Sequence, residues 1–139
     1  MGNGFLFVTP LYAALLTLWY VVLSVRVIRM RTSTKTSLGD GGNPDMLAAI
    51  RAHGNFAEYV PLALLLMVML EQGHTSVYVL HALGVVLLVA RLIHGYTLSF
   101  SYSLKRRVIG MALTFTVLAV EILLCLNLAL SGHRAFFAG

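Results

Sequence analysis

Arg51-Ala-His-Gly-Asn55-Phe-Ala-Glu58-Tyr59-Val-Pro61 is the stretch that decides the fold, because it sets charged side chains into a long apolar segment. A charged group at bilayer depth costs roughly 2.5 kcal/mol or more, and it normally faces a protein interior or a wet cavity. At about 100° per residue, Asn55 lies about 40° and Glu58 about 20° from Arg51 around a helix. The stretch therefore predicts a membrane-spanning helix with one polar face.

The composition of the whole chain supports this interpretation. Of its 139 residues, 59% are hydrophobic and only 11% are charged, whereas soluble domains are about half apolar. The formal net charge is +5, and in so apolar a chain a basic excess sets membrane orientation. No basic stripe with interleaved aromatic residues occurs on a soluble domain, so a nucleic-acid partner is not expected.

Four apolar runs are each long enough to cross a bilayer, which takes about 20 residues; they cover residues 5–30, 44–72, 76–100 and 108–130. The first run lacks a preceding positive segment and ends in arginines, so we interpret it as a retained span. No linker divides the chain. Residues 1–139 are therefore predicted to form one all-α integral membrane domain, a bundle of four transmembrane helices.

Several local signals predict how the second span begins and bends. The segment Gly39-Asp-Gly-Gly42 is typical of a turn, and Asn43 followed by Pro44 is typical of a helix N-cap and first helical residue. Pro61 lies inside the second span, so we expect a kink that leaves the carbonyl of Ala57 without its helical partner.

The basic residues predict the orientation in the membrane. They cluster in the first and third connections, at Arg26, Arg29, Arg31, Lys35, Lys105, Arg106 and Arg107. The positive-inside rule places both connections in the cytoplasm, with the termini and the Gly73 loop on the opposite side. Short loops and compactness favour a bacterial inner membrane.

The polar residues of two spans are expected at overlapping depths. At about 1.5 Å per residue, Arg51, Asn55 and Glu58 lie roughly 10, 17 and 21 Å from the start of the second span. Arg91 and His94 lie roughly 14 and 9 Å from the same membrane face. These residues predict a cationic pocket whose mouth carries Arg29, Arg31, Arg106 and Arg107.

Such a pocket suits a small polyanion, because a guanidinium group binds carboxylates or phosphates bidentately and stays charged when desolvated. Glu58 has two possible roles, as a counter-ion for Arg51 or Arg91 or as an acceptor for a ligand ammonium group. A ligand with two carboxylates, one ammonium group and a thiol matches this inventory. A nearby arginine would lower the pKa of the thiol from its ordinary value of about 8.5.

The motif Arg51-Ala-His-x-Asn55-x-x-Glu58-Tyr59-x-Pro61 resembles the second-helix signature of the membrane-associated proteins in eicosanoid and glutathione metabolism (MAPEG). Arg91-Leu-Ile-His94, followed by Arg107, resembles the third-helix signature and the loop after it. The resemblance covers essentially the whole chain.

The resemblance implies a homotrimer of four-helix bundles that binds glutathione between neighbouring subunits at the cytoplasmic side. It implies that the glutathione-binding set comprises Arg51, Asn55, Glu58 and Tyr59, with help from Arg29 or Arg31, together with Arg91, His94 and Tyr96. An arginine at the start of the fourth helix would stabilise the thiolate. Arg107 is the expected catalytic residue, and Arg106 is the alternative.

The chain departs from the family pattern in one place. Family members usually carry a tyrosine four residues beyond the position of His94, and here that residue is Leu98. Tyr96 lies roughly 160° from Leu98 around a helix, so it would replace that tyrosine only in a locally unwound helix. Tyr102 is the other tyrosine near this position.

Structural interpretations of the same residues stay open. The polar face of the second span would also suit an interhelical hydrogen-bond cluster, and the loop arginines would suit contacts with lipid headgroups.

His81 and Glu121 lie at similar depth and are expected to pair. Cys125, the single cysteine, is expected to be a small buried hydrophobe. No spacing of His, Cys and carboxylate residues predicts a metal site.

The function predicted from these features is a membrane-bound glutathione transferase or peroxidase that detoxifies lipophilic electrophiles or hydroperoxides. Its expected partners are glutathione as co-substrate, a lipophilic small molecule, the lipid bilayer and two further copies of the chain. Two alternatives remain. One is a non-catalytic lipid-binding or regulatory member of the same family, and the other is a small transporter, because four spans with buried carboxylates suit that class as well.

Overall fold

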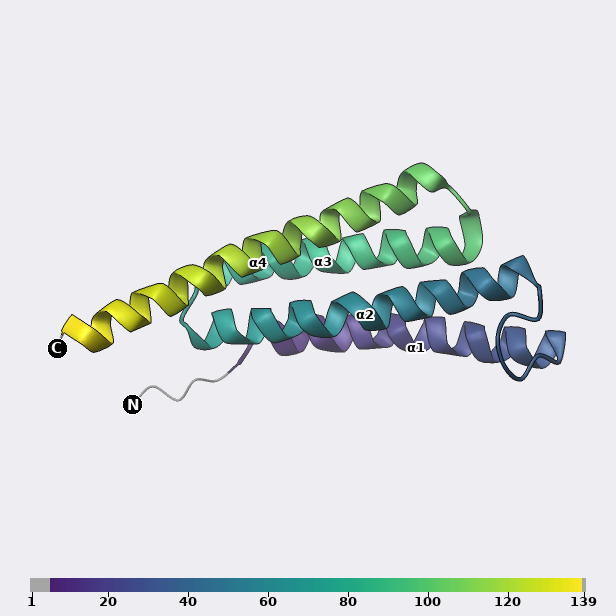
Figure 1. The fold of residues 1–139 in the computed structure, drawn as a ribbon, viewed down its shortest axis with the longest axis horizontal. Coiled ribbons are helices and arrows are strands. Elements are labelled where there is room, and N and C mark those ends of the chain that lie inside the picture. The colour runs from purple at the N-terminus through teal and green to yellow at the C-terminus, as the bar shows by residue number, and fades with distance from the viewer. Residues whose placement is uncertain (1–5, 139) are drawn as a thin grey trace.

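A computed structural model describes residues 6–138, with the side chains described as far as residue 132. The chain forms four long helices and, within the described residues, no strand. They are α1 (Val8–Thr34), α2 (Pro44–Gln72), α3 (Val77–Tyr96) and α4 (Leu104–Ala138), with a π-helical turn η1 (Thr97–Ser101) directly after α3 (Figure 1). All four helices are long and apolar enough to span a membrane, which confirms the predicted fold class.

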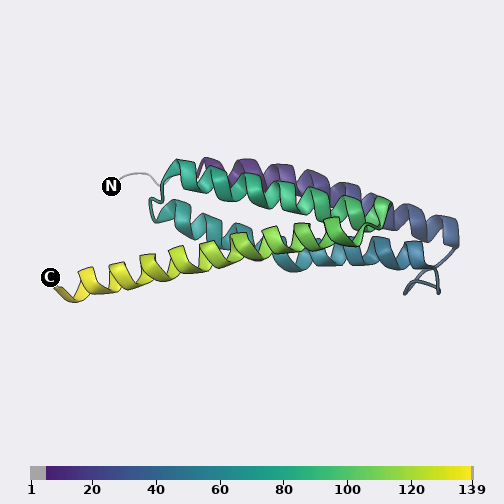
Figure 2. The ribbon, with the colours of Figure 1, turned by 90° about the horizontal axis from the view of Figure 1, so that it is seen from above.

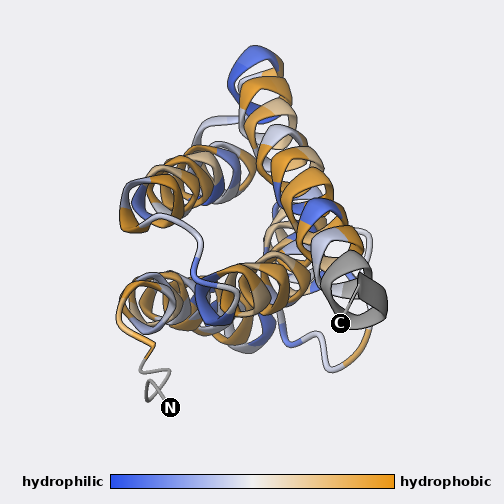
Figure 3. Cartoon of the chain, turned by 90° about the vertical axis from the view of Figure 1, so that its left-hand side faces the viewer, coloured by the Kyte–Doolittle hydropathy of each residue, from blue (hydrophilic) through white to orange (hydrophobic). Residues whose placement is uncertain are grey.

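The helices form two hairpins, α1 with α2 and α3 with α4, which lie side by side along the bundle (Figures 1 and 2). We call the end that carries loop 35–43 and residues 102–103 the basic end. The end that carries the short loop before α3 is the opposite end. Figure 3 looks along the bundle and shows apolar residues on the outer faces of the helices as well as between them, as expected for a bundle surrounded by lipid.

The predicted bounds of two helices differ from the structure. The first helix was expected to end at residue 30 but continues to Thr34, and the fourth was expected over residues 108–130 but runs over Leu104–Ala138. Hydropathy marks the lipid-facing part of a helix, whereas backbone hydrogen bonding needs no apolar side chain. At the end of α1, the hydroxyls of Thr32 and Thr34 donate to the carbonyls of Ile28 and Met30, at 3.1 and 2.8 Å.

The turn before α2 is confirmed. Gly39, Gly41 and Gly42 have φ angles of 65°, 59° and 74°, in the left-handed region that glycine adopts without steric cost. Asn43 caps α2, since its side-chain oxygen accepts hydrogen bonds from the backbone N–H groups of Asp45 and Met46 at 2.9 and 3.1 Å. The helix continues through Pro61 to Gln72.

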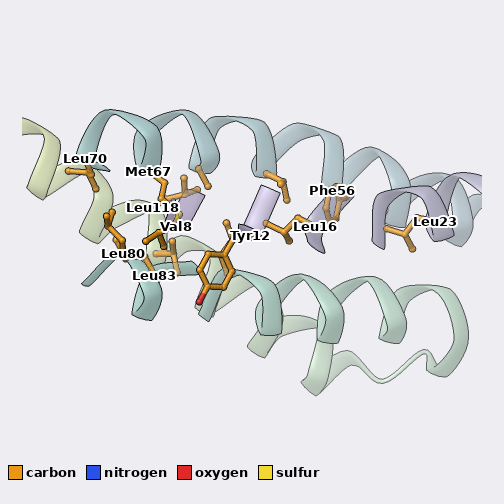
Figure 4. Close-up of a cluster of buried hydrophobic side chains, with 14 of the residues drawn as sticks. Val8, Tyr12, Leu16, Leu23, Phe56, Met67, Leu70, Leu80, Leu83 and Leu118 are labelled. Atoms are coloured by element: carbon orange, nitrogen blue, oxygen red, sulfur yellow. The ribbon is translucent and has the colours of Figure 1, made fainter. Parts of the chain in front are cut away.

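The apolar core lies along the axis of the bundle and takes residues from all four helices. The members labelled in Figure 4 are Val8, Tyr12, Leu16, Leu23, Phe56, Met67, Leu70, Leu80, Leu83 and Leu118. Glycine allows the closest approach within this core. A Cβ atom at Gly84 would lie 2.2 Å from the ring of Tyr12, so α1 and α3 pack through a residue without a side chain.

The predicted pair of His81 and Glu121 is wrong. His81 Nδ1 lies 3.0 Å from the hydroxyl of Tyr12. Glu121 is fully buried, and neither carboxylate oxygen has a hydrogen-bond partner among the described residues. Similar depth in the bundle does not determine which neighbour a side chain faces, and His81 faces α1.

A contact that the sequence analysis missed closes the opposite end of the bundle. The carboxylate of Glu71, at the end of α2, accepts hydrogen bonds from the backbone N–H groups of Phe7, Val8 and Thr9 at 2.6, 2.7 and 2.8 Å. The first N–H groups of a helix have no partner within it, and they carry partial positive charge. Glu71 therefore caps α1 from another helix.

We expect Glu71→Gln to lower the stability of the protein by about 1–2 kcal/mol. Glutamine offers one acceptor oxygen and no charge in place of two charged acceptors. Thermal unfolding in detergent measures the effect. Asp40→Asn is the matched control, because the Asp40 carboxylate accepts one N–H group, that of Gly42, in an exposed loop. Equal losses in both variants would contradict the capping role.

Candidate functional site

A polar pocket at the basic end has a volume of about 400 Å³ and lies between α2, the end of α3 and the start of α4. Its lining includes four of the residues predicted from the sequence, Arg51, Asn55, His94 and Arg107. The other lining residues are Pro44, Leu47, Ala48, Leu98, Tyr102 and Met111. No carboxylate belongs to this lining within the described part of the chain, so two guanidinium groups dominate its charge.

Arg91 lies behind the pocket wall. It is fully buried, and its guanidinium group donates to Asn55 Oδ1 at 2.6 Å and to the hydroxyl of Thr114 at 3.2 Å. Because Asn55 Oδ1 is the acceptor in this hydrogen bond, the amide NH₂ of Asn55, which lines the pocket, stays available as a donor. Arg91 was predicted to bind the ligand directly, whereas the structure places it where it orients Asn55 and joins α2, α3 and α4.

His94 connects the end of α3 to the start of α4. Its side chain is 3% exposed, and Nδ1 lies 3.2 Å from the backbone carbonyl oxygen of Arg107. A carbonyl oxygen can only accept, so Nδ1 carries the proton in this contact. In the neutral ring, Nε2 is then the acceptor that His94 can offer to a ligand.

Arg107 and Arg106 are placed differently. Both are exposed, but only Arg107 lines the pocket. Arg107 also lines an adjoining cavity of about 200 Å³, together with Thr97, Leu98 and Ser103. The structure therefore brings Arg107, and not Arg106, next to Arg51 and His94.

The two arginines predicted from the first helix lie away from this pocket in a single chain. Arg31 donates to the carbonyl oxygens of Thr36, Ser37 and Gly39 at 3.3, 3.0 and 3.3 Å and so holds the loop after α1. Arg29 is exposed and lines a separate cavity on the outer face of α1.

Glu58 and Tyr59 also lie outside the pocket. Glu58 is exposed on α2, and no ion pair joins it to Arg51 or Arg91 within the described chain. Tyr59 is half-buried, and its ring meets that of Phe115 edge-on at a centroid distance of 5.5 Å. The predicted counter-ion role of Glu58 is therefore not fulfilled within one chain.

The helix after His94 is locally altered, but Tyr96 does not enter the pocket. The α-helical pattern gives way to the π-helical turn η1 at Thr97. Tyr96 is 52% exposed, and its ring lies 5.4 Å from that of Phe100. Leu98 and Tyr102 line the pocket instead, and the hydroxyl of Tyr102 donates to the carboxylate of Asp45.

The hydrogen bond to Asp45 raises the pKa of Tyr102 above its ordinary value of 10.0. The folded state thus holds this proton more tightly than the unfolded state does. The contribution to stability is complete below about pH 10 and is lost as the pH rises through the raised pKa.

We expect the melting temperature of the wild type to fall more steeply above about pH 10 than that of Tyr102→Phe, which has no hydroxyl to titrate. Thermal unfolding in detergent over a pH series measures this difference. The control is Tyr78→Phe, since Tyr78 is 87% exposed and lies at the opposite end. Indistinguishable pH profiles for the wild type and Tyr102→Phe would contradict the assignment.

A four-span α-helical membrane protein with a cationic pocket at its basic end is the class that this fold and site define. A sequence model of the MAPEG family matches residues 9–127, and the chain belongs to this family.

Two similar proteins are both named inner membrane protein YecN, one from Escherichia coli strain K12 and one from Escherichia coli O6:H1 strain CFT073. Each is 38% identical over 117 residues, which cover 84% of this chain and 88% of YecN. With four apolar helices, the comparison supports a multi-pass protein of a bacterial inner membrane.

Proposed function

We propose that the protein is a glutathione-dependent transferase or peroxidase that acts on lipophilic electrophiles or hydroperoxides from the bilayer. One observation carries this proposal: a single pocket of about 400 Å³ gathers Arg51, Asn55, His94 and Arg107 at the basic end. Its volume is in the range of sites for small organic ligands, about 300–1,000 Å³. Its charge favours a ligand that brings its own carboxylates, as glutathione does.

Each lining residue has a defined task in this proposal. Arg51 binds a glutathione carboxylate bidentately, and the NH₂ of Asn55 donates to the peptide backbone of the ligand. Arg107 lies beside the thiol and favours the thiolate, because a neighbouring cation lowers the pKa of a thiol. His94, held by the Arg107 carbonyl, fixes the position of this segment.

The chemistry follows from a positioned thiolate. The thiol proton leaves to water at the open mouth of the pocket. The sulfur lone pair then forms a bond to the electrophilic carbon, and the leaving group departs with its electron pair. With a hydroperoxide, two glutathione molecules are oxidised to the disulfide while the hydroperoxide is reduced to an alcohol and water.

The proposal includes a homotrimer, which the outer face of α2 supports. Arg51 and Glu58 are both exposed there, within a helix long enough to span the membrane. Lipid would leave these charges without partners at a high cost. A second copy packed against this face would cover Glu58 and could bring an arginine of its α1 to the site.

We expect glutathione to produce a thiolate difference spectrum with the purified wild-type protein. Arg51→Ala should weaken glutathione binding by roughly tenfold or more, because it removes a charge-assisted bidentate contact. Arg107→Ala should still bind glutathione, but the thiolate signal should vanish and conjugation should slow by roughly 100-fold. Lys105→Ala, which removes a charge at the same end but outside the pocket, is the control.

The results of these binding and turnover measurements distinguish the candidate functions. No glutathione signal with the wild type would overturn the proposal. Binding without turnover of electrophiles or hydroperoxides would support the non-catalytic alternative. The carboxyl of Glu121 is buried and has no hydrogen-bond partner in the described part of the chain, which favours the transporter alternative. Counterflow in proteoliposomes that depends on Glu121 would support that function instead.

A further inference from the structure

A second cavity, of about 380 Å³, lies on the outer face of α1 and shares no residue with the candidate site. It has two parts. Arg26 and Arg29 form its polar part, and Val21, Val22 and Val25 form its apolar wall. Phe100, from η1, closes the side next to α3.

Arg26 is already positioned in this cavity. Its guanidinium carbon lies 4.2 Å from the centroid of the Phe100 ring, a geometry that attracts a cation to the ring face. Its Nε atom is buried and has no hydrogen-bond partner among the described residues. The side chain is thus held by stacking, while its buried Nε–H group has no acceptor within the described chain.

The cavity spans the depth at which a lipid headgroup meets its acyl chains. Counted back from Thr34 at about 1.5 Å per residue, Arg29 and Arg26 lie roughly 8 and 12 Å from the end of α1, and Val22 lies roughly 18 Å from it. The two cations therefore stand above an apolar wall that extends towards the hydrocarbon. Val21 and Val22 are about half exposed, at 51% and 46%.

No ion pair joins Arg26 or Arg29 to any of the five acidic residues within the described part of the chain. Near the basic end, the carboxylates of Asp40 and Asp45 accept hydrogen bonds from Gly42 and Tyr102. Glu71 caps α1 at the opposite end, Glu121 is buried, and Glu58 is exposed on α2. An anionic ligand would therefore supply the charge that these two arginines lack within one chain.

We propose that this cavity binds an anionic phospholipid, with its phosphodiester on Arg26 and Arg29 and one acyl chain along the valines. A zwitterionic lipid would not offset the charge of two arginines. Free phosphate would leave the apolar wall unused. Within one chain, this cavity shares no residue with the pocket assigned to glutathione, so the two proposals can be tested separately.

The test uses the full chain purified in mild detergent, with phosphatidylglycerol, phosphatidylcholine or inorganic phosphate added. Native mass spectrometry counts bound lipid, and thermal unfolding measures stabilisation. Phosphatidylglycerol should bind and stabilise the wild type, whereas the other two should not. The double variant Arg26→Gln/Arg29→Gln should bind phosphatidylglycerol roughly 30-fold more weakly, and Lys105→Gln should bind it like the wild type.

A second variant keeps the arginines and fills the apolar part of the cavity. Val22→Trp should weaken phosphatidylglycerol binding even though the charge of the protein is unchanged. The proposal is overturned if phosphate stabilises as well as the lipid does, or if Lys105→Gln loses as much affinity as the double variant. It is also overturned if the double variant dissociates an oligomer, because this face would then be an interface between copies.

Discussion

Arg91→Met is expected to lower the stability of the protein by about 2–4 kcal/mol, because buried polar partners would be left without hydrogen bonds. The guanidinium group of Arg91 joins Asn55 of α2 to Thr114 of α4 from a fully buried position on α3. Methionine replaces most of the volume but provides no donor. Thermal unfolding in detergent measures the loss.

The same substitution is expected to weaken glutathione binding under the proposed function. Without Arg91, the amide of Asn55 loses its hydrogen bond and can rotate, so its NH₂ no longer has a fixed direction. Thr114→Val is the matched control, since it removes one bond of Arg91 and leaves the contact with Asn55. If Arg91→Met binds glutathione as Thr114→Val does, Arg91 does not position Asn55.

Gly110→Ala is expected to destabilise the protein by about 2–3 kcal/mol, as overpacked core substitutions do. A Cβ atom at Gly110 would lie 2.8 Å from the Cβ of His94, 2.9 Å from the carbonyl oxygen of Ala90 and 3.0 Å from the backbone nitrogen of His94. Two of these neighbours are backbone atoms, which cannot move aside as a flexible side chain can. The start of α4 would have to separate from α3.

Separation of these helices would also displace His94 from the Arg107 carbonyl, so glutathione affinity should fall together with stability. Gly132→Ala is the control in the same helix, because a Cβ atom there would meet no atom within 4 Å. That variant should be neutral or slightly more stable, since alanine favours a helix over glycine. Equal behaviour of the two variants would show that close packing at Gly110 is unimportant.

The sequence was sufficient to predict the four spans, the bounds of α2, the Asn43 cap and the glycine turn before it. It also placed Arg51, Asn55, His94 and Arg107 near one membrane face, and the structure brings these four to one pocket. These predictions depend on apolar run length, on the helical repeat and on local backbone chemistry. Each of these is contained in a short stretch of chain.

The structure was needed to decide which side of each helix faces which neighbour. The number of residues between two side chains gives the angle between them around one helix. The rotation of that helix in the bundle, however, depends on its packing against the other three helices. Arg91 therefore lies behind the pocket wall. His81 bonds Tyr12, and Glu121 has no hydrogen-bond partner within the described residues. Tyr96 lies outside the pocket, whereas Tyr102 lines it.

What the sequence by itself determined, then, is a four-helix membrane protein with a polar, cationic end, because hydropathy and charge act locally along the chain. Only the tertiary structure decided that Glu71 caps α1 and that Arg107, not Arg106, reaches the pocket. The Glu71 contact joins residues that are far apart in the chain, and the pocket distinguishes two arginines that are adjacent in the chain. Both features depend on the relative rotation and depth of packed helices, which no single helix specifies.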